Sequence, residues 1–143
     1  MERRTVPELW REAVRDAPAG PAYLEETADE WRPVTRDEAA ERVSALAQGL
    51  LARGVRHGDR VAVLSRTRLE WILLDWAVMA IGAVVVGLYP TSSAKECEYI
   101  LDHCEAVLAF TEDWLVAAGL LCCTQNQGRG HSSTDPANEA TTR

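Results

Sequence analysis

The sequence lacks a cluster of basic residues. Its 143 residues include 15 Lys and Arg against 22 Asp and Glu, which gives a formal net charge of −7. Nucleic acids are bound through a basic face that matches their phosphates. The charge balance therefore argues against a nucleic-acid partner.

The N-terminus, MERRTVPELWREAV, lacks the apolar stretch of a secretory signal, because its basic residues are not followed by an apolar run. The four cysteines also lack the spacing of a disulfide framework or a zinc site. Cys97 and Cys104 are separated by a helical interval, and Cys122 and Cys123 are adjacent. We therefore expect a cytoplasmic protein.

One hydrophobic run, residues 71–89, is long enough to raise the question of a membrane span. It contains a single charge, Asp75, which would cost roughly 2.5 to 3.5 kcal/mol near the centre of a membrane helix. Its second half is rich in valine and follows a glycine, which is typical of a strand. We expect no transmembrane span here.

The bulk composition is that of a globular domain, with 47% hydrophobic and 26% charged residues. Within it, residues 58–111 alternate twice between a strand-like and a helix-like hydrophobic pattern. The expected elements are a strand at residues 60–65, a helix at 68–81, a strand at 83–89, a helix from Ser93 and a strand at 106–110. Such alternation predicts an α/β fold, with a parallel sheet and right-handed crossovers.

Capping signals mark the helix ends in this region. Thr67 with Glu70, and Ser93 with Glu96, have the spacing of a capping box. Gly82 is expected to end the first of these helices, because glycine tolerates the left-handed conformation found there.

Two amphipathic helices and a small β hairpin are expected before this unit. The helices are predicted at residues 5–17 and 35–53, each starting with a Thr and Glu capping box, at Thr5 and at Thr35. The hairpin is predicted at residues 22–26 and 31–35, with Pro33 favouring an edge strand.

The periodic pattern decays after residue 111. Thr111 has the position of a cap for one more short helix through Trp114, but residues 119–143 are polar and aperiodic. We therefore predict a folded domain at residues 1–118 and a disordered or frame-shifted tail at 119–143. The abrupt change in composition favours a truncated or frame-shifted end. The alternative is a naturally short protein with a flexible tail.

The runs GDRVAVLSRTRLEW and GAVVVGLYPTSSAKECEYILDHCEA resemble the opening part of the AMP-forming adenylate-forming superfamily. Within it, LYPTSSA followed by EYIL is most similar to long-chain fatty acyl-CoA synthetases. The resemblance covers about the first 115 residues. It implies the N-terminal subdomain of that fold and a partial AMP-binding domain.

The resemblance also implies a parent reaction. A fatty acid attacks the α-phosphate of Mg-ATP, and coenzyme A then displaces AMP from the acyl-adenylate. The family uses a Gly, Ser and Thr-rich loop ending in lysine, later acidic and aromatic nucleotide contacts, and a lysine in a mobile C-terminal domain. None of these motifs is present in the sequence. We therefore assign no catalytic, cofactor-binding or metal-binding residue, and expect this chain alone to be inactive.

Several local features have a functional and a structural interpretation. The turn Pro90 to Ser93 follows a strand and precedes a helix, which is where sheets of this type bind ligands, although helix capping explains it more simply. His103 beside Cys104 lacks a third group for a metal or a nucleophile. His57 is expected in solvent, and residues 128–130 resemble a phosphate loop only superficially. The packing tryptophans are expected to be Trp10, Trp71, Trp76 and Trp114, with Trp71 or Trp76 as a less favoured wall of an acyl pocket.

A second function class remains open, namely a stand-alone α/β module that binds a partner or self-associates through an open sheet edge. Such a module is expected to protect its edge. The strand expected at residues 106–110 contains no Lys or Pro that would do so, which favours a fragment of a ligase.

Overall fold

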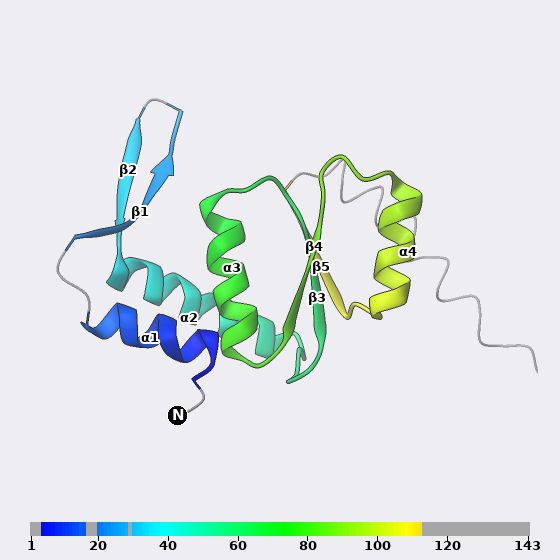
Figure 1. The fold of residues 1–143 in the computed structure, drawn as a ribbon, viewed down its shortest axis with the longest axis horizontal. Coiled ribbons are helices and arrows are strands. Elements are labelled where there is room, and N and C mark those ends of the chain that lie inside the picture. Colours follow the sequence, from blue (N-terminus) through cyan, green and yellow to red (C-terminus); the bar gives the residue numbers. More distant parts are fainter. Residues whose placement is uncertain (1–3, 17–19, 29, 113–143) are drawn as a thin grey trace, which may run out of the picture.

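The computed structural model describes residues 4–16, 20–28 and 30–112 (Figure 1). The predicted tail at 119–143, Trp114 and residues 128–130 lie outside the described residues. The elements are α1 (Val6–Asp16), β1 (Pro21–Glu26), β2 (Trp31–Thr35), α2 (Arg36–Ala52), β3 (Arg60–Leu64), α3 (Leu69–Ala80), β4 (Val84–Leu88), α4 (Ala94–Cys104) and β5 (Leu108–Thr111). The predicted order of helices and strands is confirmed, with bounds that differ by a few residues.

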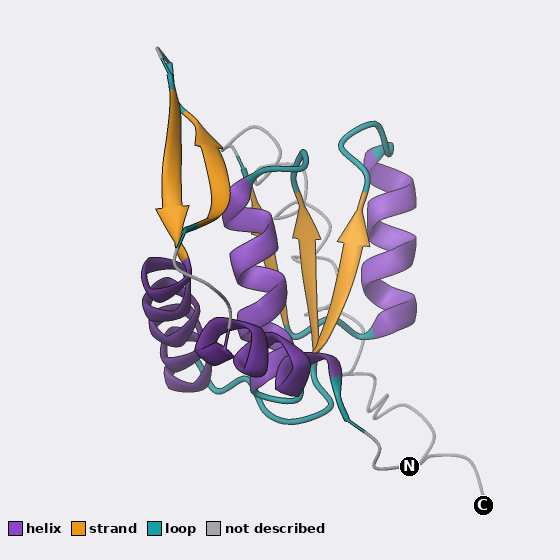
Figure 2. Ribbon diagram, turned by 60° about the vertical axis from the view of Figure 1, so that its left-hand side comes forward, coloured by secondary structure: helices purple, strands orange, loops and turns teal. Residues whose placement is uncertain are grey.

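Three of the strands form a parallel sheet in the order β4-β3-β5. The strand β3 is central, so that Val61 pairs with Val85 of β4 and with Leu108 of β5. Figure 2 shows helices on both faces of this sheet. The predicted β-α-β-α-β unit is therefore confirmed, and the crossover through α4 carries the chain from one edge of the sheet to the other.

Alternate side chains of β3 build the two halves of the core. Val61 and Val63 point to the face covered by α2 and α3, where they join the larger buried cluster. Ala62 and Leu64 point to the opposite face, where Cys97 and Leu101 of α4 cover them. Because β3 is buried on both faces, it is apolar almost throughout, as expected for a central parallel strand.

The strands β1 and β2 form the predicted antiparallel hairpin, and Pro33 pairs with Leu24. An ion-pair cluster connects this hairpin to α2. Arg32 bonds Glu25 (2.9 Å) and Glu38 (3.0 Å), and Arg42 bonds the same two carboxylates. The hydrogen bond from Arg32 lowers the pKa of Glu25, whose side chain is 19% exposed. These contacts hold the hairpin at the N-terminal end of α2.

The capping predictions have mixed outcomes. The Ser93 and Glu96 capping box is complete, and Glu8 bonds both the amide and the hydroxyl of Thr5. Thr35 accepts from the amide of Glu38. The prediction for Thr67 is wrong, because Arg68 is the N-cap of α3 and makes no side-chain cap bond there.

The carboxylate of Glu70 explains why the Thr67 capping box does not form. It accepts from the guanidinium of Arg68, at 2.7 and 3.1 Å, instead of reaching back to Thr67. A bidentate, charge-assisted pair of hydrogen bonds is stronger than a single hydrogen bond from a neutral amide. The spacing of Thr67 and Glu70 fits a capping box, but the intervening arginine competes for the acid.

The hydrophobic run at residues 71–89 is divided between two elements, since α3 ends at Ala80 and β4 begins at Val84. Among the described residues, no helix has the length and hydrophobicity that crossing a membrane requires. Asp75 is half-buried on α3, and burial raises the pKa of its carboxyl. Ala80, the last residue of α3, is exposed.

Candidate functional site

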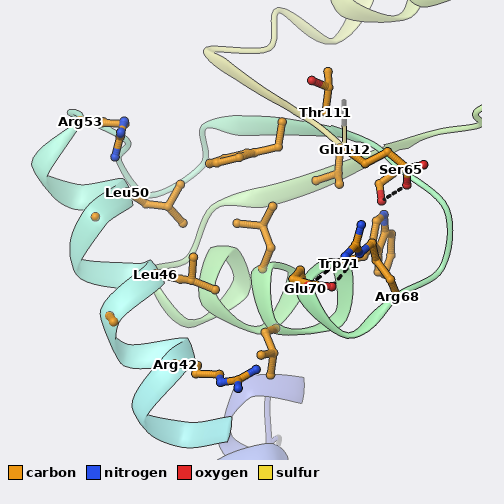
Figure 3. Close-up of a pocket in the computed structure, with 16 residues that line it drawn as sticks. Arg42, Leu46, Leu50, Arg53, Ser65, Arg68, Glu70, Trp71, Thr111 and Glu112 are labelled. Carbon is orange, nitrogen blue, oxygen red and sulfur yellow. Dashed lines mark hydrogen bonds and ion pairs between the residues drawn. The ribbon is translucent and has the colours of Figure 1, made fainter. Parts of the chain in front are cut away.

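An open groove is present beside the carboxyl ends of β3 and β5, the region where sheets of this type bind ligands. Its cavity volume is about 740 Å³. Figure 3 shows α2 along one side of the groove and α3 beneath it, with the ends of the strands opposite. The groove is thus built by three segments that are far apart in the sequence.

Apolar side chains line most of this groove. The sequence places them there because α2 turns part of its stripe toward the sheet and α3 is apolar almost all round. The apolar lining residues are Ala45, Leu46, Gly49, Leu50, Val63, Trp71, Leu73, Leu74 and Phe110. A surface of this kind binds apolar groups.

The carboxylate of Glu112 closes one end of the groove. It accepts from the amide of Arg66 (2.8 Å), from the guanidinium of Arg66 (2.8 Å) and from the hydroxyl of Ser65 (2.9 Å). These bonds lower the pKa of Glu112 to about 2, with the amide of Arg66 as the largest cause. Glu112 therefore fixes the loop after β3 against the end of β5.

The bonds from Ser65 and Arg66 to the carboxylate of Glu112, called the Glu112 clamp below, predict a specific pH dependence of stability. A carboxyl whose pKa is lower in the folded state stabilises the fold only while it is ionised. The contribution of Glu112 is present above about pH 4.5 and is lost as the pH falls toward about 2. We expect the melting temperature to fall over that interval, and Glu112→Gln to lower it at neutral pH while flattening the acid dependence.

Glu30→Gln is the matched control, because Glu30 is exposed at the turn of the hairpin. Thermal melts of the three proteins between pH 2 and pH 7 make the comparison. An acid dependence equally steep in Glu112→Gln and in the wild-type chain would contradict the clamp.

Basic residues lie at the rim of the groove. Arg42 is paired with acids of the hairpin and of α2, and Arg68 is paired with Glu70. The hydroxyl of Ser65 is held by the carboxylate of Glu112 and the carbonyl of Arg66. The polar groups of Arg42, Arg68 and Ser65 are thus held by partners within the chain, beside a lining that is mostly apolar.

The turn from Pro90 to Ser93 lies at the end of β4 and leads into α4. The carboxylate of Glu96 accepts from the amide of Ser93 (2.7 Å) and from its hydroxyl (2.8 Å). An acid of the chain itself thus occupies the position that an external anion would take. The capping interpretation of this turn accounts for its polar groups.

His103 and Cys104 are not brought into a reactive cluster. The ring of His103 is exposed and stacks on Tyr99, with ring centroids 5.7 Å apart. The thiol of Cys104 lies 3.6 Å from the carbonyl of Leu101, and burial raises the pKa of the Cys97 thiol. Over residues 4–16, 20–28 and 30–112, no group of three His, Cys, Asp or Glu side chains is placed to hold a metal ion.

Of the tryptophans that the structure describes, Trp10, Trp71 and Trp76 pack against the main core cluster, as predicted, whereas Trp31 on β2 is 61% exposed. The rings of Trp10 and Trp76 stack with centroids 5.4 Å apart, which attaches α1 to α3. Trp71 packs against the core and lines the groove, so that this interpretation and that of a pocket wall coincide at one residue. His57 is exposed, as expected, although its ring lies against Gly82.

Sequence reasoning missed the groove and the clamp at Glu112. The bonds of Glu112 join residues 46 and 47 positions apart, and no local pattern connects such partners. Hydrophobic periodicity predicts an apolar face on α2, but it does not show which elements that face contacts.

Comparison with protein families finds a match over residues 10–142 to the model described as AMP-binding enzyme. The chain is 42% identical over 111 residues to the long-chain-fatty-acid–CoA ligase FadD15 of Mycobacterium bovis, and the match covers 78% of this chain and 18% of that protein. It is 32% identical over 114 residues to the long-chain-fatty-acid–CoA ligase heimdall of Drosophila melanogaster, and this match covers 77% of this chain and 17% of that protein.

The fold is similar to that of solved adenylation proteins. Klebsiella oxytoca NpsA, solved in complex with 3-hydroxyanthranilyl-AMSN, matches with a TM-score of 0.70 and 28% identity over 78% of this chain and 22% of that one. The chain therefore spans less than a quarter of this protein and less than a fifth of the two ligases. The N-terminal subdomain of NpsA, solved by itself, also matches, with a TM-score of 0.70, and the chain covers 28% of that subdomain.

Proposed function

Because the chain belongs to the AMP-binding enzyme family, we propose that it is the N-terminal part of an ATP-dependent long-chain fatty acid–CoA ligase, inactive by itself. The parent reaction joins a fatty acid to coenzyme A and converts ATP to AMP and pyrophosphate. The observation that carries the proposal is the 42% identity to a long-chain-fatty-acid–CoA ligase along 78% of this chain. The parallel sheet with its two helical layers supports it.

The residues that the structure describes do not assemble a site for the cofactors of the parent reaction. Adenylate formation needs cations and hydrogen-bond donors around a transition state that is rich in negative charge. The sequence has one lysine, Lys95, which is exposed on α4. The amide and hydroxyl of Ser93 are bonded by Glu96, and the described residues offer no cluster for magnesium. ATP, Mg²⁺ and coenzyme A are therefore assigned to the longer parent and not to this chain.

A direct assay tests this proposal. The purified chain is incubated with palmitate, Mg-ATP and coenzyme A, and both fatty-acid-dependent ATP–pyrophosphate exchange and acyl-CoA formation are measured. We expect neither to rise above the rate without enzyme, whereas the FadD15 ligase, as the positive control, gives both. Fatty-acid-dependent exchange by this chain would contradict the proposal.

The remaining assignments follow from the same proposal. We place the protein in the cytoplasm, and we place the boundary between the partial AMP-binding domain and the tail at residue 118. The family match extends beyond that boundary to residue 142, so the boundary is a proposal about packing rather than about family membership.

A second candidate function is partner binding or self-association through the sheet edge. The strand β5 pairs with β3 on one side, and none of the described strands pairs with its other side. Unpaired strand edges recruit other chains. Sedimentation velocity at increasing protein concentration tests this candidate. A sedimentation coefficient that rises with concentration supports pairing through the sheet edge, and a constant monomer value contradicts self-association.

A further inference from the structure

We propose that the outer edge of β1 binds an extended peptide of a partner protein as a third strand of the hairpin, and that this peptide alternates apolar with basic residues. The inference goes beyond the proposed enzymatic role, and it concerns the N-terminal hairpin rather than the edge of the parallel sheet. Three observations carry it: a cleft beside β1, backbone groups of β1 that the hairpin does not use, and a carboxylate in the cleft that forms no ion pair.

A second cleft lies between the hairpin and the N-terminal end of α3, and its volume is about 580 Å³. Figure 1 shows the hairpin standing beside α3. Residues 23–27 and Trp31 line one wall of the cleft, and residues 66–70 and Ile72 line the other. Successive side chains of a strand point to opposite faces, so a run of consecutive residues lines a cleft when the strand turns its edge toward it. The strand β1 therefore presents its edge to this cleft.

The backbone groups of β1 at this edge are not used by the hairpin. The amide of Thr27 bonds across the turn (2.9 Å), and opposed residues of an antiparallel pair alternate between hydrogen-bonded and non-hydrogen-bonded. The next pair, Glu26 with Trp31, is therefore not hydrogen-bonded. The same holds two residues further for Leu24, whose partner Pro33 has no amide hydrogen to donate. The amides and carbonyls of Leu24 and Glu26 thus point away from β2.

The two outer edges of the hairpin differ in their capacity to accept another strand. On β2, Pro33 offers no amide hydrogen at the outer edge, and proline in such a position opposes strand pairing. On β1, Leu24 keeps its donor. Among the described strands, β1 is paired with β2 alone. An added strand is therefore expected on the side of β1, where the cleft lies.

Exposed apolar side chains flank this edge. Leu24 is 60% exposed and Trp31 is 61% exposed, and both line the cleft. Ile72 of α3 lies on the opposite wall and is half-buried. Covering apolar surface favours association. Apolar residues of the bound strand supply that cover, while its backbone bonds to β1.

The unpaired charge of the cleft is negative. Four of its charged lining residues are held in ion pairs, which are Arg66 with Glu112, Arg68 with Glu70, and Glu25 with Arg32. The fifth, Glu26, is exposed and forms no ion pair within residues 4–16, 20–28 and 30–112. Opposite charges on neighbouring strands stabilise their pairing, so Lys or Arg of the peptide fits beside Glu26. A second copy of the chain would instead bring the same acids and a net charge of −7.

A peptide titration of the full chain tests the proposal. The probe is acetyl-Lys-Val-Lys-Val-Lys-amide, and binding is followed in two-dimensional amide NMR spectra. We expect the amides of Leu24 and Glu26 to shift most, because they gain hydrogen-bond partners. The matched control is the same peptide with every amide N-methylated, which removes its backbone donors. Equal shifts with both peptides would contradict strand addition.

Two substitutions of Leu24 separate the backbone from the side chain. Leu24→Pro removes the outward amide hydrogen and is expected to weaken binding of the Lys peptide about tenfold, whereas Leu24→Ala keeps the amide and is expected to weaken it less. The hairpin tolerates proline here because the amide of Leu24 does not bond to β2, and thermal melts check this. Equal losses in the two variants would contradict a backbone-paired strand, and the N-methylated peptide tests the same point without a substitution.

Glu26→Lys tests the chemistry of the partner. We expect it to weaken binding of the Lys peptide about fivefold and to favour acetyl-Glu-Val-Glu-Val-Glu-amide instead. Glu30→Lys, at the turn of the same hairpin and outside the cleft lining, is the matched control and leaves both affinities unchanged. An unchanged preference in Glu26→Lys would overturn the assignment of a basic peptide. A dimer of the wild-type chain that Leu24→Pro abolishes would overturn it as well, because a second copy would then occupy the edge.

Discussion

Replacing Leu73 by alanine is expected to lower the free energy of unfolding by about 2 to 5 kcal/mol, the range for large-to-small changes in a packed core. Leu73 is 2% exposed on α3, where it belongs to the main buried cluster and lines the groove. Its truncation removes packing contacts within that cluster and leaves a cavity. Denaturant unfolding followed by circular dichroism measures the change.

Leu51→Ala is the matched control for this substitution. Leu51 lies on α2 and is 47% exposed, so its replacement deletes the same atoms with little loss of buried surface. Exposed substitutions of this kind usually change stability by less than about 0.5 kcal/mol. A loss for Leu73→Ala no larger than that for Leu51→Ala would show that α3 does not pack on the sheet as described.

Gly82→Ala is expected to destabilise the fold for two separable reasons. Gly82 has φ +75° after the end of α3, a conformation that costs an alanine roughly 1 to 2 kcal/mol. An added Cβ would also lie 2.4 Å from Cδ2 of His57. The carbonyl of Gly82 accepts from the amide of Gly58 (2.8 Å), so a shift of this turn disturbs the entry to β3 as well.

His57→Ala separates these two contributions. In the double variant the clash is gone and the strained backbone remains, so we expect part of the stability to return, with a loss of roughly 1 to 2 kcal/mol persisting. Thermal or urea melts of the two single variants and the double variant complete the cycle. A double variant as stable as His57→Ala alone would contradict the role of the backbone conformation.

The order of the elements was predictable because each has a clear local pattern. The alternation of apolar runs and helical stripes between residues 58 and 111 predicts the strands and helices of the sheet. Ser93 with Glu96, and Gly82 after α3, predict helix ends because the partners are a few residues apart. Such short-range interactions can be predicted from the sequence because both partners lie within a few residues of each other.

The wrong and missed predictions have two causes. Neighbouring residues compete for the same hydrogen-bond partner, and residues far apart in the sequence come together only in the folded chain. Thr67 does not cap α3, because Arg68 binds the acid that the cap requires. Glu112 and Arg66 are separated in the sequence by two helices and two strands, so they meet only after the sheet has formed. The groove likewise depends on how α2 crosses the sheet, which hydrophobic periodicity does not specify.

The most direct test of the proposed identity is the coding DNA beyond the codon for Trp114, translated in all three frames. The proposal predicts that one frame continues into a Gly, Ser and Thr-rich loop that ends in lysine, the phosphate-binding feature of the parent ligase. If no frame encodes such a loop before closing, the chain is not the front part of a fatty acid–CoA ligase gene, and that result would contradict the proposal.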